Sequence, residues 1–307
     1  MRMLRQYGAV LALLLQVFSR HAAADPIVYK IPPNETDPQI HRFLNDNWVM
    51  FFPPSRPSAD LFVFLSGTAR TEEGGPEVPN TLGFLTVAAE AGYRVISLTY
   101  DDHPAVLQVC RANPDPNCFA QFREKRIFGD NVTPLIDDTP SESVINRLAK
   151  LLQLLERQHP NEGWGAYLAG GMPVWSRIAV AGHSQGAGMA AFIAKKYPVA
   201  RVVLSSGPED AAMGLLAPWI SERSATPPDR WFALYHQRDR FAPVIERALP
   251  AAGVPPSHVR MLNQEPMRLA GPNPYHVSVV GDGSTPRGPN GSPLYRGDWA
   301  FVIGRSP

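Results

Sequence analysis

Apolar and polar positions alternate along the chain in a way that predicts strands separated by helices. Short apolar runs rich in β-branched and aromatic residues are typical of strands buried in a parallel sheet. We expect strands at residues 27–31, 48–52, 61–65, 93–100, 177–181, 201–205, 231–236 and 258–262, and helices at 82–90, 140–155, 186–196 and 243–249. Strands joined through helices form right-handed crossovers, so this order predicts an α/β fold, a mostly parallel central sheet with helices on both faces.

The clearest predicted helix begins near residue 140. Thr139 is placed as its N-cap, Pro140 as its first residue and Glu142 as the partner in a capping box. Apolar side chains then recur with the helical period of about 3.6 residues, at Val144, Ile145, Leu148, Leu151, Leu152 and Leu155. This stripe predicts an amphipathic helix packed against the sheet.

Composition favours a single folded domain. The apolar fraction of 44% supports a buried core, and the charged fraction of 19% is too low for a disordered chain. No internal repeat and no linker divides the sequence. We therefore expect one domain over residues 25–307.

The N-terminus has the layout of a secretory signal. A short basic segment (1–7) precedes an apolar run (9–18), and three alanines end at Ala24, before Asp25. The apolar run is too short to span a bilayer of about 30 Å, and no other stretch is long and apolar enough. We expect residues 1–24 to be removed and the protein to be secreted or periplasmic. Residues 1–24 carry three arginines and no acid, so their removal changes the formal charge of the chain from +1 to −2. A chain this close to neutral lacks the excess of positive charge that nucleic-acid binding needs.

The two cysteines are predicted to pair if the protein is exported. Cys110 and Cys118 flank a segment of turn-forming residues (113–117), and in an oxidising compartment we expect them to form one disulfide. Two free thiols are the alternative. No Cys/His cluster has zinc spacing and no HExxH is present, so neither a metal nor a cofactor is predicted.

The candidate chemistry lies in Gly182-His183-Ser184-Gln185-Gly186, between an apolar strand and a helix of small residues. Such a sharp turn strains the backbone of the central residue, and the flanking glycines remove Cβ atoms that would clash. The turn lifts the Ser184 hydroxyl clear of the sheet, near a helix N-terminus that favours an oxyanion. An ordinary glycine-rich turn is the alternative.

In this motif and its strand-to-helix setting the chain resembles the α/β-hydrolase superfamily, over essentially the whole mature sequence. Its Gly-His-Ser-Gln-Gly run looks like those of lipases, cutinases and carboxylesterases. The resemblance implies a single-domain hydrolase fold with a serine nucleophile, an acid after a later strand and a histidine near the C-terminus. A serine hydroxyl needs an imidazole to take its proton, and that imidazole needs a carboxylate.

Two acids fit the position that the resemblance implies. Asp239 follows the strand at 231–236 and precedes a proline-started helix, and it is the favoured acid. Asp210 follows the preceding strand and stays as the alternative acid. His276 lies beyond the last predicted strand, in what reads as a loop, and it is the expected general base.

The resemblance also implies two main-chain donors for an oxyanion. One is the amide of Gln185, and the other comes from the loop after the strand at 61–65. Many relatives have His-Gly-x in this loop, whereas this chain has Ser66-Gly67-Thr68, which assigns the second donor to Thr68.

These residues predict a serine hydrolase that cleaves carboxylic esters through an acyl-enzyme. We expect a small-molecule or surface-presented ester, with a short acyl chain, in an open or loop-rimmed site. The segment at 207–230 is too short for a large lid, and the other candidate cover is 101–138. A serine peptidase or amidase, an inert hydrolase-fold binding module and, less favoured, a thioesterase remain as alternatives. The sequence gives no oligomeric state.

Overall fold

The computed structural model describes residues 25–53, 59–68, 79–269 and 271–305, so the predicted export signal at 1–24 lies outside the described residues. The strands are β1 (Ile27–Ile31), β2 (Asn47–Phe51), β3 (Leu61–Leu65), β4 (Arg94–Leu98), β5 (Leu168–Ala169), β6 (Met172–Pro173), β7 (Ile178–His183), β8 (Arg201–Ser205), β9 (Ala211–Ala212), β10 (Leu215–Leu216), β11 (Trp231–His236) and β12 (Val259–Leu262). The α-helices are α1 (Pro33–Thr36), α2 (Leu82–Glu90), α3 (Val106–Cys110), α4 (Cys118–Phe128), α5 (Val144–Gln158), α6 (Gln185–Lys196), α7 (Ala242–Ala252), α8 (Pro274–Ser278) and α9 (Arg296–Ile303).

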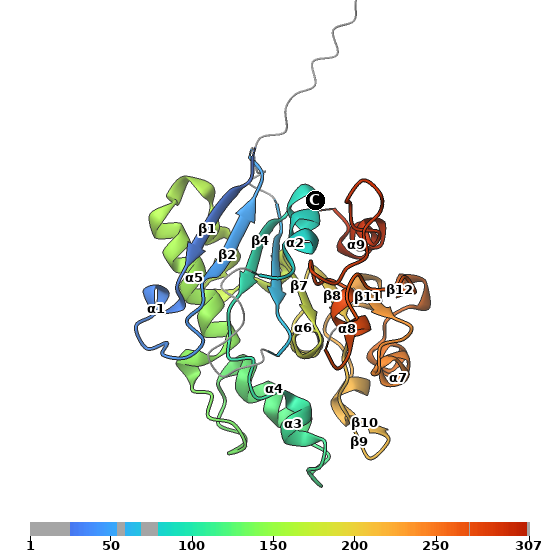
Figure 1. The fold of residues 1–307 in the computed structure, drawn as a ribbon. Coiled ribbons are helices and arrows are strands. Elements are labelled where there is room, and N and C mark those ends of the chain that lie inside the picture. Colours follow the sequence, from blue (N-terminus) through green and yellow to red (C-terminus); the bar gives the residue numbers. More distant parts are fainter. Residues whose placement is uncertain (1–24, 54–58, 69–78, 270, 306–307) are drawn as a thin grey trace, which may run out of the picture.

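A single large sheet organises the molecule (Figure 1). Its order is β1-β2-β4-β3-β7-β8-β11-β12. Strand β2 pairs antiparallel with β1 and β4, and all other neighbours in the sheet are parallel. The two short pairs, β5–β6 and β9–β10, lie outside this sheet. The predicted mostly parallel sheet is confirmed.

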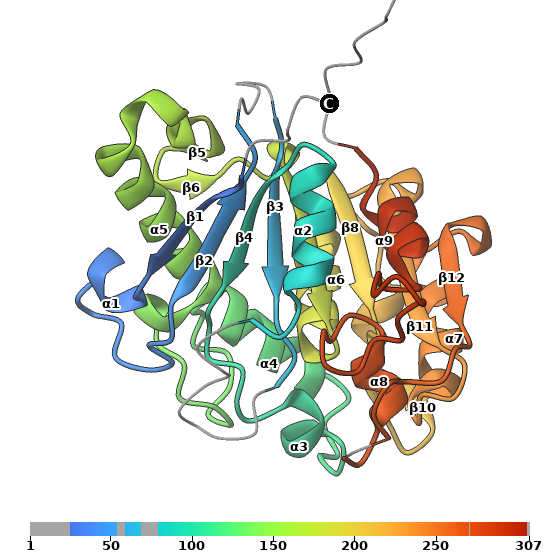
Figure 2. The same cartoon turned by 45° about the horizontal axis from the view of Figure 1, so that its top comes forward.

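Helices cover both faces of the sheet and bury two apolar cores. Figure 2 shows α2 and α9 in front of the sheet, with α4, α5 and α6 on the other side. The smaller core lies under α2 and α9, where Phe84 meets Trp299 edge-on at 5.8 Å between ring centroids. The larger core lies under α4, α5, α6 and α7. Burial of apolar surface on both faces holds the layers together.

The short apolar runs predicted the strands closely. Strands β1, β3, β8 and β11 and helix α2 have the predicted bounds, and the other strands of the large sheet differ by one or two residues at their ends. The predicted strand at 93–100 shortens to β4, and the one at 177–181 extends into the glycine-rich turn as β7. Differences of this size are usual at the ends of elements.

The start of the helix predicted from residue 140 is wrong. Residues Pro140–Glu142 form a separate 3₁₀ turn, and α5 begins only at Val144. The Ser143 hydroxyl accepts from the Asn146 amide at 3.2 Å, and so it takes the role given to Thr139. Glu142 instead accepts from the main chain of His41 at 2.7 Å and pairs with Arg147. Contacts distant in sequence therefore take the carboxylate out of the predicted capping box.

The segment at 101–138 contains helices where the sequence indicated loops. It folds into α3 and α4, near the carboxyl end of β3 (Figure 2). The disulfide between Cys110 and Cys118 joins the two helices, which confirms the predicted pairing. In the described part of the chain, no helix reaches the length and hydropathy needed to cross a membrane.

Candidate active site

The turn that carries Ser184 is tight and strained. Ser184 has φ 55° and ψ −122°, a positive φ that non-glycine residues rarely adopt. A Cβ on Gly182 would lie 2.2 Å from the main chain of Gly186, and a Cβ on Gly186 would lie 2.0 Å from the Leu65 carbonyl oxygen. Both positions therefore require glycine, because the two sides of the turn and the end of β3 are in close main-chain contact.

His276, the base expected from the sequence, lies beside Asp239, the favoured acid. Its Nδ1 is 2.7 Å from Asp239 Oδ2. A carboxylate can only accept, so Nδ1 carries the hydrogen and Nε2 is left as the basic nitrogen. The other oxygen, Asp239 Oδ1, accepts from the side chain of Asn273 at 2.7 Å and from the amide of Phe241 at 2.9 Å. His276 lies in the short helix α8, not in the loop that the sequence indicated.

Charge distribution in this pair suits a proton acceptor. Burial opposes charge on both side chains, but their mutual hydrogen bond and attraction outweigh it. The pKa of Asp239 is therefore lowered, although burial alone would raise it. The pKa of His276 is raised, since the carboxylates of Asp239 and Glu209 overcome the burial that disfavours its charged form.

Glu209, for which the sequence predicted no role, contacts both Ser184 and His276. The Ser184 hydroxyl donates to its Oε1 at 3.0 Å, and His276 Nε2 lies 3.6 Å from the same oxygen. Burial raises the pKa of Glu209 to about 7. The residue follows β8 at the carboxyl edge of the sheet, and this position was the signal available in the sequence. The structure thus brings Ser184, His276 and Asp239 to one place, with Glu209 among them.

Asp210 is engaged elsewhere. Its carboxylate forms a buried ion pair with Arg123 of α4, whose Nε donates to Oδ2 at 2.7 Å, and the Trp219 indole donates to the same oxygen at 2.8 Å. The structure does not place this alternative acid beside His276. Its contacts instead tie α4 to the loop that carries Glu209.

The two expected oxyanion donors face one small cavity. Thr68 and Gln185 line it together with Ser184 and Glu209, and its volume is about 30 Å³. Gln185 is the first residue of α6, so its amide has no acceptor within the helix. The residues of both expected donors and Ser184 therefore border one space.

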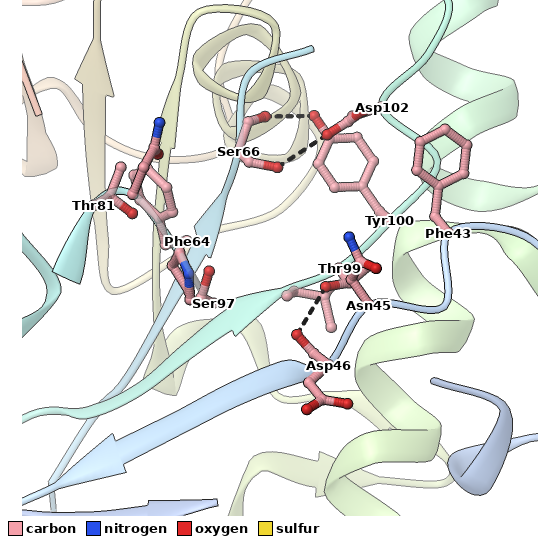
Figure 3. Close-up of a pocket in the computed structure, with 13 residues that line it drawn as sticks. Phe43, Asn45, Asp46, Phe64, Ser66, Thr81, Ser97, Thr99, Tyr100 and Asp102 are labelled. Carbon is pink, nitrogen blue, oxygen red and sulfur yellow. Dashed lines mark hydrogen bonds between the residues drawn. The ribbon is translucent and has the colours of Figure 1, made fainter. Parts of the chain in front are cut away.

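Two sets of hydrogen bonds hold this cavity. The Gln185 side chain donates to the Asp102 carbonyl at 2.7 Å and accepts from the Val106 amide at 2.7 Å, which ties the turn to α3. The loop that leads to Thr68 is held at Ser66 (Figure 3). There the Tyr100 hydroxyl donates to the Ser66 carbonyl at 2.7 Å, and the Ser66 hydroxyl donates to Asp102 at 3.2 Å.

His183 supports the helix that carries His276. Burial lowers its pKa to about 3, so it stays neutral. Its Nε2 lies 3.0 Å from the His276 carbonyl oxygen, which can only accept, so Nε2 donates. The Ser206 hydroxyl donates to the same carbonyl at 3.3 Å. These two bonds fix the main chain at the histidine.

A larger open groove of about 610 Å³ adjoins the small cavity. It is bounded by α3, the β9–β10 pair and α7, and Glu209 lines both spaces. Residues of 101–138 therefore rim the site through α3. Among the described residues, no group of three or more His, Cys, Asp or Glu side chains is arranged to hold a metal ion.

The sequence matches no protein-family model and no curated protein. Among solved structures it is similar to a cold-adapted esterase from an Arctic intertidal metagenomic library, with 12% identity, 80% of this chain and 86% of that chain covered, and a TM-score of 0.39. It is also similar to an α/β serine hydrolase homologue from Coxiella burnetii, with 16% identity, 73% of this chain and 84% of that chain covered, and a TM-score of 0.37. A third similar structure is an α/β hydrolase enzyme from a Medee basin deep-sea metagenome library, with 14% identity, 78% of this chain and 81% of that chain covered, and a TM-score of 0.37.

Proposed function

We propose that this chain, whose sheet and serine turn have the architecture of the α/β-hydrolase fold, is a serine hydrolase that cleaves carboxylic esters. One observation carries the proposal. The hydroxyl of the strained Ser184 and the basic nitrogen of His276 approach the same oxygen of Glu209, at 3.0 and 3.6 Å, while Asp239 holds the far side of the imidazole. A nucleophile, a base and an orienting acid gathered around one point are what acyl transfer needs.

The proposed reaction has two halves. Ser184 attacks the ester carbonyl while His276 takes its proton, and Asp239 stabilises the imidazolium that forms. The main-chain amides of Thr68 and Gln185 hold the oxyanion, and His276 returns the proton to the leaving alcohol. Water then attacks the acyl-enzyme with His276 again as base, which releases the acid and restores Ser184.

Glu209 adds a second partner for the nucleophile. To react, the Ser184 hydroxyl must turn from Glu209 Oε1 towards His276 Nε2, which lies 3.6 Å from that oxygen. A negative Glu209 next to Nε2 also stabilises the imidazolium. We propose that Glu209 is a positioning residue, and that Asp239 remains the acid of the triad.

The substrate proposal follows from the open groove and from export. The groove admits a small-molecule or surface-presented ester, and short acyl chains remain the expected preference. We also propose that residues 1–24 direct the protein to the periplasm or the exterior, and the Cys110–Cys118 disulfide is consistent with an oxidising compartment. Mass spectrometry of the exported protein should then find Asp25 as the first residue, and retention of Met1 would contradict this.

The experiment that tests the proposed function uses a fluorophosphonate label and a panel of p-nitrophenyl esters. Wild-type protein should form an adduct on Ser184 and turn over the esters, whereas Ser184→Ala should lose the adduct and at least about 10⁴-fold in kcat. Ser221→Ala, at an exposed serine, is the matched control and should behave as wild type.

The other functions give different results in this experiment. Folded wild-type protein without an adduct indicates the inert binding module. Peptide or amide substrates that outcompete the esters indicate a peptidase or amidase. Activity that survives Ser184→Ala contradicts the serine mechanism altogether.

A further inference from the structure

The groove beside Glu209 combines apolar walls with three arginines. Its apolar lining includes Leu107, Met213, Phe241 and Val244. Arg111 stands at the end of α3, and Arg240 and Arg247 stand before and within α7. All three arginines are exposed to solvent. A ligand in the groove therefore meets apolar surface and guanidinium groups together.

None of these arginines is paired with a carboxylate within the described part of the chain. The Arg111 guanidinium has no side-chain hydrogen bond or ion pair there. Arg247 donates to the Gly214 carbonyl at 2.9 Å, and Arg240 lies over the Phe241 ring at 4.6 Å. By contrast, the buried Arg126 is matched by Asp138 at 3.0 Å. The groove therefore carries positive charge that its own walls do not balance.

The charge lies next to the reacting groups. Among the residues that line the groove, Glu209 supplies the one carboxylate, and its Oε1 is turned towards Ser184 and His276. Because Glu209 and Leu107 also line the small cavity, the groove lies next to the space that Ser184 lines. The guanidinium groups are left to meet a charge brought by the ligand.

We propose that this groove binds a carboxylate carried by the ester substrate, an inference that rests on the proposed ester hydrolysis. Guanidinium groups match the planar geometry of a carboxylate and form charge-assisted hydrogen bonds with it. The apolar side chains suit a hydrocarbon spacer between that carboxylate and the ester. The substrate class is therefore an ester with an acidic end, and the groove holds that end while Ser184 attacks the carbonyl.

A binding experiment tests the groove without turnover. In the Ser184→Ala background, calorimetry compares monomethyl adipate with the neutral methyl ester of adipamic acid. The anion should bind at least about 5-fold more tightly. Arg111→Gln should reduce this ratio, Arg111→Lys should retain part of it, and Arg157→Gln, at an exposed position of α5, should retain all of it. Equal affinities for the two esters, or a ratio that does not respond to Arg111→Gln, would overturn the proposal.

A turnover experiment separates this inference from the proposed function. The p-nitrophenyl monoesters of glutaric, adipic and suberic acid are compared with their amide-ended analogues, and 4-acetoxybenzoate with 4-acetoxybenzamide, so that the charge lies on the acyl or on the leaving side. A higher kcat/KM for the acidic member of either series supports the groove. Equal hydrolysis in both series overturns the groove but leaves the hydrolase, whereas a binding preference without hydrolysis supports the groove and overturns the hydrolase.

Discussion

Three carboxylates near Ser184 have different contacts. Asp239 touches the far nitrogen of His276, Glu209 touches the near side together with the serine, and Asp210 neutralises Arg123. All three are buried. Their surroundings give them different tasks, and substitutions can separate these tasks.

Asp239→Asn and Asp210→Asn should fail in different ways. Asp239→Asn keeps the shape but no longer holds His276 in the required tautomer, so kcat should fall by about 10⁴-fold. Asp210→Asn leaves the charge of Arg123 buried and unmatched, so stability should fall by about 3–5 kcal/mol. Ester kinetics and thermal unfolding of both variants check this. A larger kcat loss in Asp210→Asn than in Asp239→Asn, measured on folded protein, would reverse the assignment.

Glu209→Gln should move the pH dependence of hydrolysis. His276 must be neutral to act as base, and the negative charge of Glu209 raises its pKa. Removal of that charge lowers the pKa of His276, so the rising limb of kcat/KM should move to lower pH. Asp239 and Asp210, the other carboxylates that act on Glu209, stay in place.

A pH profile with a neutral ester measures this shift. The pKa of Glu209 itself is about 7, so the wild-type limb reports two coupled groups, and the variant should report one. Glu246→Gln is the control, since this exposed carboxylate of α7 accepts from the hydroxyl of Tyr235 on β11 and does not contact His276 or Ser184 among the bonds of the described residues. An unchanged limb in Glu209→Gln, or a move to higher pH, would mean that Glu209 does not act on the imidazole.

Helices α3 and α4 connect the disulfide to the proposed active site. Cys110 ends α3 and Cys118 begins α4, while α3 also carries the amide of Val106 that fixes Gln185. Arg111 follows the first cysteine directly. The crosslink therefore limits the freedom of one wall of the groove.

Replacement of both cysteines by serine should lower stability and weaken the groove. Loss of this short loop closure costs about 2–3 kcal/mol on the chain-entropy view. The denaturant midpoint should fall, and KM for an acidic ester should rise more than KM for its amide-ended analogue. Reductant should destabilise the wild type and leave the double variant unaffected. Equal midpoints for the wild type and the double variant would show that the helices hold this wall without the crosslink.

The elements that sequence patterns revealed are those whose signals are local. The strands at 61–65 and 231–236 are short apolar runs buried in the sheet, and the glycines around Ser184 are required by close main-chain contacts. Helix α4 was missed because charged residues that the fold also buries stand between its apolar ones, and its Arg123 finds its partner 87 residues away. Glu209 was missed for a related reason, since its role depends on where its side chain meets two distant residues.

The net charge of the molecule is small, but its positive charge is unevenly distributed. The chain beyond residue 24 has a formal charge near zero, yet three arginines without carboxylate partners among the described residues gather at one groove. Most of the buried arginines are matched by acids, as in the pair of Arg147 with Glu142. A molecule of low net charge can therefore still present a local positive field beside its proposed active site.

This field predicts how salt acts on hydrolysis. The Debye length falls from about 10 Å at 0.1 M to about 3 Å at 1 M ionic strength, so attraction between exposed arginines and an anionic substrate weakens as salt rises. The kcat/KM for the p-nitrophenyl monoester of adipic acid should fall several-fold over this range in potassium chloride, and its amide-ended analogue serves as the control because it carries no charge. Arg111→Gln should flatten the salt dependence of the acidic ester. If both esters respond to salt alike, the arginines do not attract the substrate, and its acidic end is held by something other than their charge.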